Sequence, residues 1–214
     1  MGIRNTRSDF GSIAKWLHWV TAFCMLASYA AIYYRIYVSP HCDKMTPLSD
    51  CAPDNVFALR AHTGFGFTVA ALVVLRLVWR WMNPVPDPAP GSRMQHLAAH
   101  VSHYGLYFLL ITLPLTGWLG VMGDASFFGW FKVTGFVNTP VYEPFVTNWL
   151  GLTFQEFEKP IDWFHKVLGG TWIFWLLFVA HVVAGFYHHF VMRDRVLVRM
   201  LPAGWMADPR PREK

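Results

Sequence analysis

The chain has 214 residues, of which 54% are hydrophobic and only 14% are charged. Soluble domains usually carry about 25% charged residues, so this composition disfavours a soluble globular protein and favours an integral membrane protein. The formal net charge of +5 would suit a nucleic-acid ligand, but the basic residues gather beside apolar segments, which favours a topology signal and no nucleic-acid partner.

A membrane-spanning helix needs about 20 mostly apolar residues, and four windows of the chain meet that length. The first window is too long for the apolar part of a cleaved signal peptide, so we interpret it as a retained span. Pro114 in the third window predicts a bend, which membrane helices tolerate. The prolines of "NPVPDPAPGS" predict a stiff loop between the second and third windows. The expected spans run from about 13 to 34, 57 to 81, 98 to 121 and 167 to 192.

Lysine and arginine indicate the orientation of these spans. Twelve of the 18 basic residues fall on the side that also holds both chain ends. Basic residues collect on the cytoplasmic side of a membrane, so we expect both termini there. We predict an all-α, integral membrane four-helix bundle in which residues 1–214 form one domain. The connection 122–166 then lies outside, and its length favours short surface helices or a functional cap.

Four histidines fall within or beside the spans at two membrane depths. His18 and His181 lie toward the inner side, and His62 and His165 lie toward the outer side. An ionisable group inside a bilayer is costly, so each should have a partner. Two neutral imidazoles that face each other across a helix bundle suit the two axial positions of a haem iron. The pattern therefore predicts two haems stacked through the bilayer as a path for electrons.

Other interpretations of these histidines stay open. A single histidine in a span is often a hydrogen bond between helices, and only the pairing at two depths favours iron. Zinc sites favour cysteine, or closely spaced histidines with a carboxylate, and the spans hold few carboxylates. His188 lies seven residues after His181 on nearly the same face and is an alternative inner ligand. A haem-free transporter is disfavoured because the spans carry histidine rather than aspartate or glutamate.

Four segments, one in each span, resemble the bacterial cytochrome b561 family. They are "AKWLHWVTAF", "LRAHTGFGFTVAALVVLRLVWR", "LAAHVSHYGLYFLLITLPLTG" and "HVVAGFYHHFVMRDRVLVRML". The resemblance implies a four-helix core in the bacterial inner membrane that binds two b-type haems. It also implies that the axial ligands to the haem irons come from spans one, two and four, where they fall on His18, His62, His165 and His181.

The spacing within the fourth span departs from the family pattern, in which the two ligands lie 14 residues apart. His165 and His181 lie 16 residues apart, so a straight α-helix would point them about 160° apart. Two arrangements would bring them to one side. Either the helix is irregular near Gly169–Gly170, for example through a π-bulge, or His165 precedes the helix.

Further polar residues cluster at the inner ends of the second and third spans. Arg76 and Arg80 share a face, and the forked guanidinium suits haem propionates; lipid phosphate is the alternative partner. His96, His100 and His103 follow i, i+4, i+7 spacing at the start of the third span. Because histidine titrates near neutral pH, we interpret His100 and His103 as a quinone pocket or proton relay. Hydrogen bonds to a propionate or lipid head group are the alternative.

The resemblance implies a membrane oxidoreductase that passes electrons from an outer donor to ubiquinone. Some family members oxidise superoxide and reduce ubiquinone without a partner subunit. Lys166, beside His165, is the residue we expect to steer a small anion. Similar b-type cytochromes are instead membrane-anchoring subunits of hydrogenases and formate dehydrogenases. In that alternative the 122–166 connection docks a periplasmic redox partner.

Two further features lie outside the spans. Cys42 and Cys51 share the first outer connection, where an oxidising compartment permits a disulfide. The basic tail "MRDRVLVRMLPAGW" is expected to rest on anionic membrane lipid. Cys24 lies within the first span and is expected to be a small apolar filler.

Overall fold

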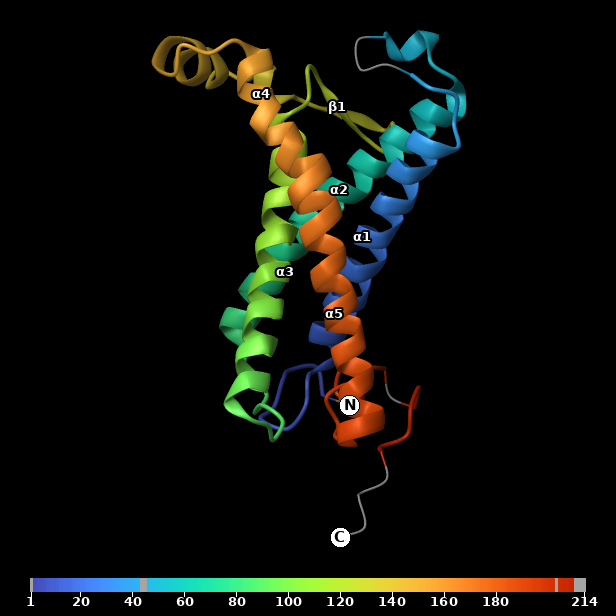
Figure 1. Ribbon diagram of the computed structural model, residues 1–214, viewed down its shortest axis with the longest axis vertical. Helices are drawn as coiled ribbons and strands as arrows, with labels where there is room; N and C mark the ends of the chain where they lie inside the picture. Colours follow the sequence, from blue (N-terminus) through green and yellow to red (C-terminus); the bar gives the residue numbers. More distant parts are fainter. Residues whose placement is uncertain (1, 43–45, 203, 210–214) are drawn as a thin grey trace.

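The computed structural model describes residues 2–42, 46–202 and 204–209. Within them, four helical rods are long and apolar enough to cross a membrane, which confirms the predicted all-α fold with four spans (Figure 1). Each rod begins before its predicted apolar window, whereas α3 ends at Leu119, two residues before the predicted end of the third window. The rods are α1 (Ser12–Tyr37), α2 (Pro53–Met82), α3 (Arg93–Leu119) and a fourth rod, Phe154–Met192.

The fourth rod is not a uniform α-helix. Two of its four segments carry the i→i+5 hydrogen bonds of a π-helix, and the longer of these includes ten residues. Its segments are α4 (Phe154–Trp163), η4 (Phe164–Ile173, π), α5 (Phe174–Tyr187) and η5 (His188–Met192, π).

Several helices begin where the local sequence signals a start. The Ser92 hydroxyl accepts a hydrogen bond from the Gln95 backbone N–H, and the Gln95 side-chain oxygen accepts one from the Ser92 backbone N–H. This capping box opens α3. Thr153 and Glu156 form the same capping box at the start of α4. Pro53 occupies the first turn of α2, where its missing N–H costs nothing.

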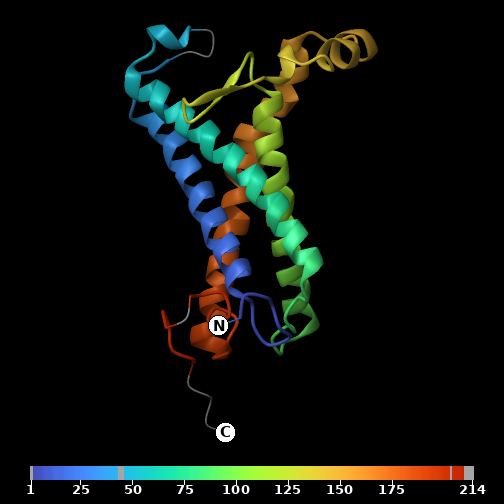
Figure 2. The ribbon, with the colours of Figure 1, turned by 180° about the vertical axis from the view of Figure 1, so that it is seen from behind.

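The rods splay toward one end of the bundle. We call the end that holds Ser12 and Met192 the inner end, and the end that holds Tyr37 and Pro53 the outer end. Figures 1 and 2 show α1 and α2 leaning away from α3 and the fourth rod toward the outer end, where an antiparallel hairpin lies across the opening. The hairpin pairs β1 (Ala125–Phe127) with β2 (Phe131–Val133), and the rings of Phe127 and Phe131 stack 4.8 Å apart.

The outer connections carry short elements besides the hairpin. The connection 122–166 holds η2 (Phe136–Asn138), the π-helix η3 (Glu143–Trp149) and α4, so the expected surface helices are present. The first outer connection holds η1 (Leu48–Asp50). Cys42 and Cys51 form a disulfide there, with Cα atoms 5.7 Å apart.

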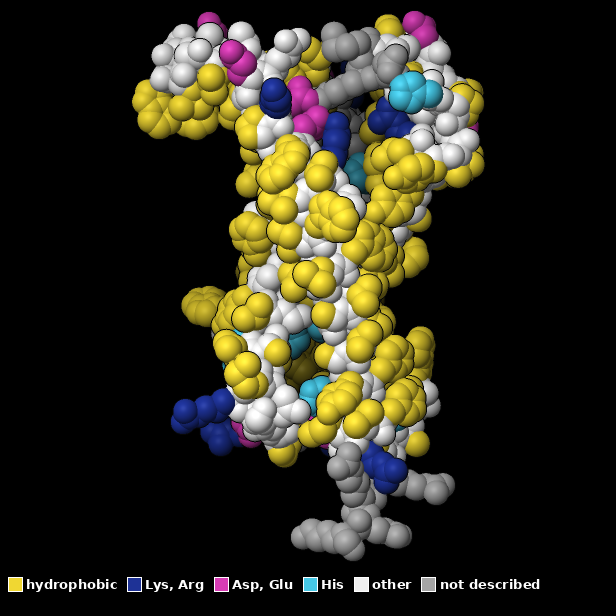
Figure 3. Space-filling model, in the orientation of Figure 1, with side chains coloured by type: hydrophobic (Ala, Val, Ile, Leu, Met, Phe, Trp, Pro, Cys, Tyr) yellow, Lys and Arg dark blue, Asp and Glu magenta, His cyan; other side chains and the backbone are white. Residues whose placement is uncertain are grey.

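The packed core lies midway along the bundle. Figure 3 shows charged side chains at both ends of one face and an apolar belt between them, as a membrane-spanning bundle requires. Cys24 is buried in the core, as expected of an apolar filler. The core residues are Leu17, Cys24, Met25, Val69, Leu72, Leu109, Leu113 and Phe174.

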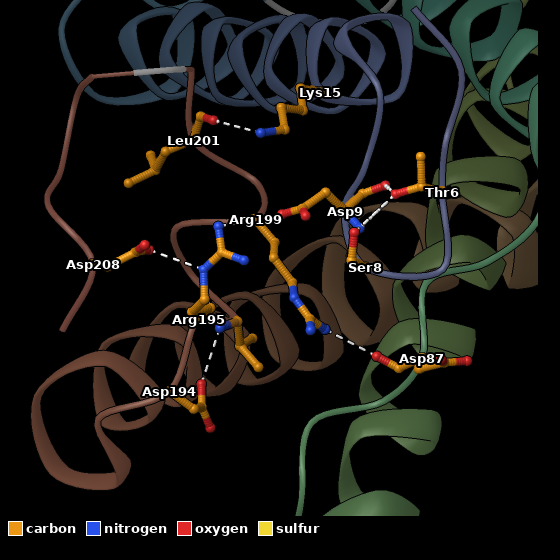
Figure 4. A network of polar contacts seen from close by, with 11 residues as sticks. Thr6, Ser8, Asp9, Lys15, Asp87, Asp194, Arg195, Arg199, Leu201 and Asp208 are labelled. Carbon is orange, nitrogen blue, oxygen red and sulfur yellow. Dashed lines mark hydrogen bonds and ion pairs between the residues drawn. The ribbon is translucent and has the colours of Figure 1, made fainter. Parts of the chain in front are cut away.

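The C-terminal segment folds back against the start of the chain (Figure 4). Arg195 pairs with Asp208 at 2.9 Å and with Asp9 at 3.5 Å. The buried Lys15 donates from Nζ to the Leu201 carbonyl over 3.0 Å. The tail therefore ties the ends of two rods together, and its predicted contact with anionic lipid stays a prediction.

Candidate functional site

Four imidazoles form two facing pairs, one toward each end of the bundle. His18 on α1 and His181 on α5 form the inner pair, with ring centroids 6.2 Å apart. His62 on α2 and His165 in η4 form the outer pair, at 6.1 Å. All four side chains are half-buried. The structure thus brings together the pairs that membrane depth predicted.

The π-helical segment explains how His165 reaches its partner. A π-helix has about 4.4 residues per turn, or roughly 82° per residue, against 100° in an α-helix. Eight steps of each kind between His165 and His181 leave the two side chains within about 20° of each other. The rod already begins at Phe154, so His165 lies inside the helix. The arrangement with His165 ahead of the helix is therefore wrong, and the irregular helix is confirmed.

The inner pair meets although its members lie at different distances from their helix ends. The α5–η5 end of the fourth rod extends past the start of α1 (Figure 1). His181 can therefore lie eleven residues from Met192 and still face His18, six residues after Ser12. Trp19, next to His18, donates from its indole to the Met200 carbonyl over 2.8 Å. This hydrogen bond joins the start of α1 to the segment that follows the fourth rod.

Hydrogen bonds orient His62 of the outer pair. Its Nδ1 lies 3.1 Å from the Ser28 carbonyl oxygen and 2.9 Å from the Ser28 hydroxyl oxygen. The Ser28 hydroxyl donates its one hydrogen to the His62 carbonyl, 3.2 Å away. Its oxygen is therefore an acceptor toward Nδ1, so Nδ1 carries the proton and Nε2 presents a lone pair.

The same arrangement recurs at His165, with partners from another helix. Its Nδ1 lies 3.0 Å from the Leu113 carbonyl oxygen and 3.2 Å from the Thr116 hydroxyl oxygen. The Thr116 hydroxyl donates to the Thr112 carbonyl over 2.6 Å. Its oxygen again accepts from Nδ1, which leaves Nε2 of His165 free to bind a metal.

A third imidazole stands beside the inner pair. His103 on α3 lies with its ring centroid 5.4 Å from that of His181. His100 is exposed and stacks on Tyr104 at 6.1 Å instead. Of the two histidines predicted to form a quinone pocket or proton relay, the structure therefore brings only His103 to the pair.

The dimensions of both pairs fit an iron held between two imidazoles. A metal–imidazole bond is about 2 Å long and the coordinating nitrogen lies about 1 Å from the ring centre, so the two centroids should be about 6 Å apart. Both pairs have this spacing, whereas His103 and His181 are closer. Among the described residues, no group of three or more His, Cys, Asp or Glu is placed to hold a bare ion.

There is also room for a flat group beside the imidazoles. A side chain at Gly66, one helical turn after His62, would meet no atom within 4 Å. On the face shown in Figure 3, the inner half is hollowed between α3 and α5, with imidazoles at the hollow. By spacing, donor type and space, the residues fit two b-type haems.

The double glycine of the fourth rod lies within the π-helical segment η4. A Cβ at Gly170 would lie 2.0 Å from the His165 carbonyl oxygen, and a Cβ at Gly169 would lie 2.8 Å from the Phe164 ring. These positions are closed to a flat ligand. The two glycines instead permit the tight packing of the π-helical turns.

The remaining predicted site residues lie around the two pairs. The Arg76 guanidinium lies 5.4 Å from the centre of the Tyr107 ring, and both Arg76 and Arg80 are within electrostatic range of His103. Lys166, at the outer level, pairs with Asp162 at 2.6 Å, so its charge is compensated locally.

Sequence reasoning missed the residues that orient the outer pair. Ser28, Thr116 and Gly117 lie in apolar runs, and a Cβ at Gly117 would come within 2.9 Å of the His165 ring. The sequence signal for these residues was a glycine or a hydroxyl side chain inside an apolar span. That signal does not show which histidine the residue contacts, because the contact is made with another helix.

The sequence of this chain is similar to those of known proteins. The sequence profile of the prokaryotic cytochrome b561 family matches residues 9–203. Cytochrome b561 homolog 2 of Escherichia coli is 27% identical over 94% of this chain and 95% of its own length. Cytochrome b561 homolog 1 of the same organism is 27% identical over 90% and 97%. The probable superoxide oxidase CybB of Yersinia pestis is 24% identical over 66% and 73%. The chain belongs to the prokaryotic cytochrome b561 family, whose members are membrane electron-transfer proteins with b-type haem.

Proposed function

We propose that this protein carries electrons across the inner membrane of a bacterium from an outer donor such as superoxide to ubiquinone. When bound, haem b accepts and releases one electron at a time. The observation that carries the proposal is the presence of two facing imidazole pairs, each spaced for an iron, near opposite ends of one bundle. His18 with His181, and His62 with His165, are the axial ligands in this proposal.

The distance between the two pairs supports a path for electrons. Ser28, which contacts His62, lies ten residues after His18 on α1, or about 15 Å along the helix. Two buried core residues of α1, Cys24 and Met25, lie between these positions. The chain thereby holds the two imidazole pairs at separate depths of one bundle.

Residues of the outer end suit a small anionic donor in this proposal. Lys166 lies next to His165 and is 60% exposed, although Asp162 compensates part of its charge. Arg60 lies two residues before His62 on α2, toward the outer end, and its side chain packs against Gly129 at the tip of the hairpin. Basic groups near a redox site raise the local concentration of anions such as superoxide.

Residues of the inner end suit the reduction of a quinone, which takes up protons as well as electrons. His103 lies beside His181, and imidazole moves protons near neutral pH. Arg76 and Arg80 supply positive charge at the same level, where propionates or a reduced quinone would carry negative charge.

Purified protein in ubiquinone-loaded vesicles tests the proposal. A pulse of superoxide is expected to reduce the quinone without any partner protein, and His165→Ala is expected to slow this at least tenfold. His41→Ala, at an exposed histidine of the first outer connection, is the matched control and should leave the rate unchanged. Quinone reduction that is absent from the wild type, or equal in His165→Ala, would refute the proposed reaction.

The outer face supports a second candidate, a membrane-anchoring subunit that receives electrons from a partner dehydrogenase or hydrogenase. Trp130 at the hairpin and Trp149 in η3 are 80% and 73% exposed there, as a docking surface for a protein would require. Co-purification of a metalloenzyme with the wild type, lost on Trp130→Ser, would favour this candidate. Superoxide-driven turnover by the chain alone would favour the first.

A further inference from the structure

The two imidazole pairs differ in what their Nδ1 atoms contact. Both members of the outer pair donate from Nδ1 to a backbone carbonyl and to a hydroxyl oxygen. Within the part of the chain that the structure describes, no protein group forms a hydrogen bond with either imidazole of the inner pair. Ser28 on α1 and Thr116 on α3 contact the Nδ1 atoms of their histidines in the same way. The same hydrogen bonding therefore arises at both outer imidazoles from two different helices.

A hydrogen bond from Nδ1 changes the imidazole as a ligand. An acceptor at Nδ1 draws the proton away from the ring and increases the basicity of Nε2. A more basic axial ligand stabilises the more positively charged, oxidised iron and so lowers its reduction potential. Four acceptor atoms act on the outer pair, two on each ring.

The surroundings of the inner pair act in the opposite direction. Arg76 is within electrostatic range of both His18 and His181. A nearby positive charge disfavours oxidised iron and raises its reduction potential. At the outer level Arg35 is likewise within electrostatic range of His62, whereas the positive charge of Lys166 beside His165 is countered by Asp162 at 2.6 Å. The contrast between the two pairs therefore rests on the hydrogen bonds at Nδ1.

We propose that Ser28 and Thr116 are positioning residues whose hydroxyl oxygens hold the outer haem at a lower reduction potential than the inner haem. The inference rests on the proposed function, since it requires haem at both pairs. One electron moves from the outer to the inner level without making or breaking a bond, and the difference in potential makes that direction favourable. The chain thereby carries a built-in polarity for electrons from the outer end toward the inner end.

Redox titration of the purified holoprotein, followed at the haem absorption bands, tests this inference. The wild type is expected to show two midpoint potentials. Ser28→Ala and Thr116→Val each remove one acceptor, and each is expected to shift the lower midpoint upward while the upper one stays in place. Because the two residues lie on α1 and α3, a shift of the same midpoint in both variants identifies their shared target.

Two further variants distinguish a change in the reduction potential from a loss of haem or of structure. Thr116→Ser keeps the hydroxyl and is expected to restore the wild-type midpoint. Thr112→Val, one turn away on α3, removes a hydroxyl that donates to the Phe108 carbonyl and is expected to shift neither midpoint. Pyridine haemochrome analysis of every variant gives the number of haems per chain, so a loss of haem is recognised separately from a shift.

The outcomes divide cleanly. A shift confined to the lower midpoint in both variants, with rescue by Thr116→Ser, supports the inference. Two haems per chain with unmoved midpoints, a shift of the upper midpoint, or a shift of both together would overturn it and leave the proposed function intact. A wild type that binds no haem, or binds one, overturns the proposed function and this inference with it.

Discussion

Single atoms decide whether His165 faces His62. Its Nδ1 is held by the Leu113 carbonyl and the Thr116 hydroxyl, and its Cε1 passes over Gly117 with no space to spare. Hydrogen bonds to a ligand imidazole fix both its orientation and its tautomer. The missing side chain at Gly117 and the hydroxyl at Thr116 are therefore as much a part of the outer site as the histidine itself.

Gly117→Ala should displace His165, because the new Cβ would lie 2.9 Å from the His165 ring. We expect the haem content to fall from two toward one per chain and the free energy of unfolding to drop by about 1–3 kcal/mol, as for other overpacked sites. Haem per chain and thermal unfolding in detergent measure the two effects. Gly185→Ala, where the nearest atom is 3.7 Å away, is the matched control and should retain both haems.

Among the elements, the π-helical segment η4 turns the His165 side chain to the same side of the fourth rod as His181. The apolar pattern and the depth of His165 were readable from the sequence because depth increases steadily along a helix. The direction of its side chain was not readable, because the change from i→i+4 to i→i+5 bonding depends on packing. Tyr29 contributes to that packing by donating to the Gly170 carbonyl over 2.5 Å.

Gly170→Ala should disrupt η4, since its Cβ would meet the His165 carbonyl oxygen at 2.0 Å. If the π-helical turns relax to α-helical ones, the 16-residue spacing turns His165 away from His62. We expect selective loss of the outer haem, seen as one midpoint potential in place of two, with the inner midpoint unchanged. Retention of both midpoints would show that the π-helical segment does not set the direction of His165.

The hairpin over the outer end should respond to acid through Asp124. Hydrogen bonds from the Asn138 side chain and the Gly135 backbone lower the pKa of the Asp124 carboxyl. A lowered pKa stabilises the fold fully above the unfolded value of about 4, and this contribution is lost as the pH falls through the folded pKa. Hydrogen exchange, corrected for intrinsic rates, should show residues 124–138 losing protection below about pH 4. Asp124→Asn should already be less protected at pH 6 and show no such step.

At the scale of the whole molecule, apolar windows predicted the four spans, and depth predicted both imidazole pairs. Two groups of contacts were beyond the sequence. The contacts of the Ser28 and Thr116 hydroxyls depend on a histidine of a neighbouring helix, which the local sequence does not specify. The β1–β2 hairpin forms from segments too short to show a strand pattern. The ion pairs of Arg195 with Asp9 and Asp208 were likewise not predictable, because they join segments far apart in the sequence.

Two imidazole pairs at separate depths, with hydrogen bonds at the Nδ1 atoms of the outer pair, make the bundle a polarised path for electrons in the proposed function. The most direct test is pyridine haemochrome quantitation with a reduced-minus-oxidised spectrum on the purified wild type, His165→Ala and His181→Ala. Two b-type haems per chain are expected in the wild type and one in each variant. A colourless wild type, or two haems remaining in either variant, would contradict the proposed function.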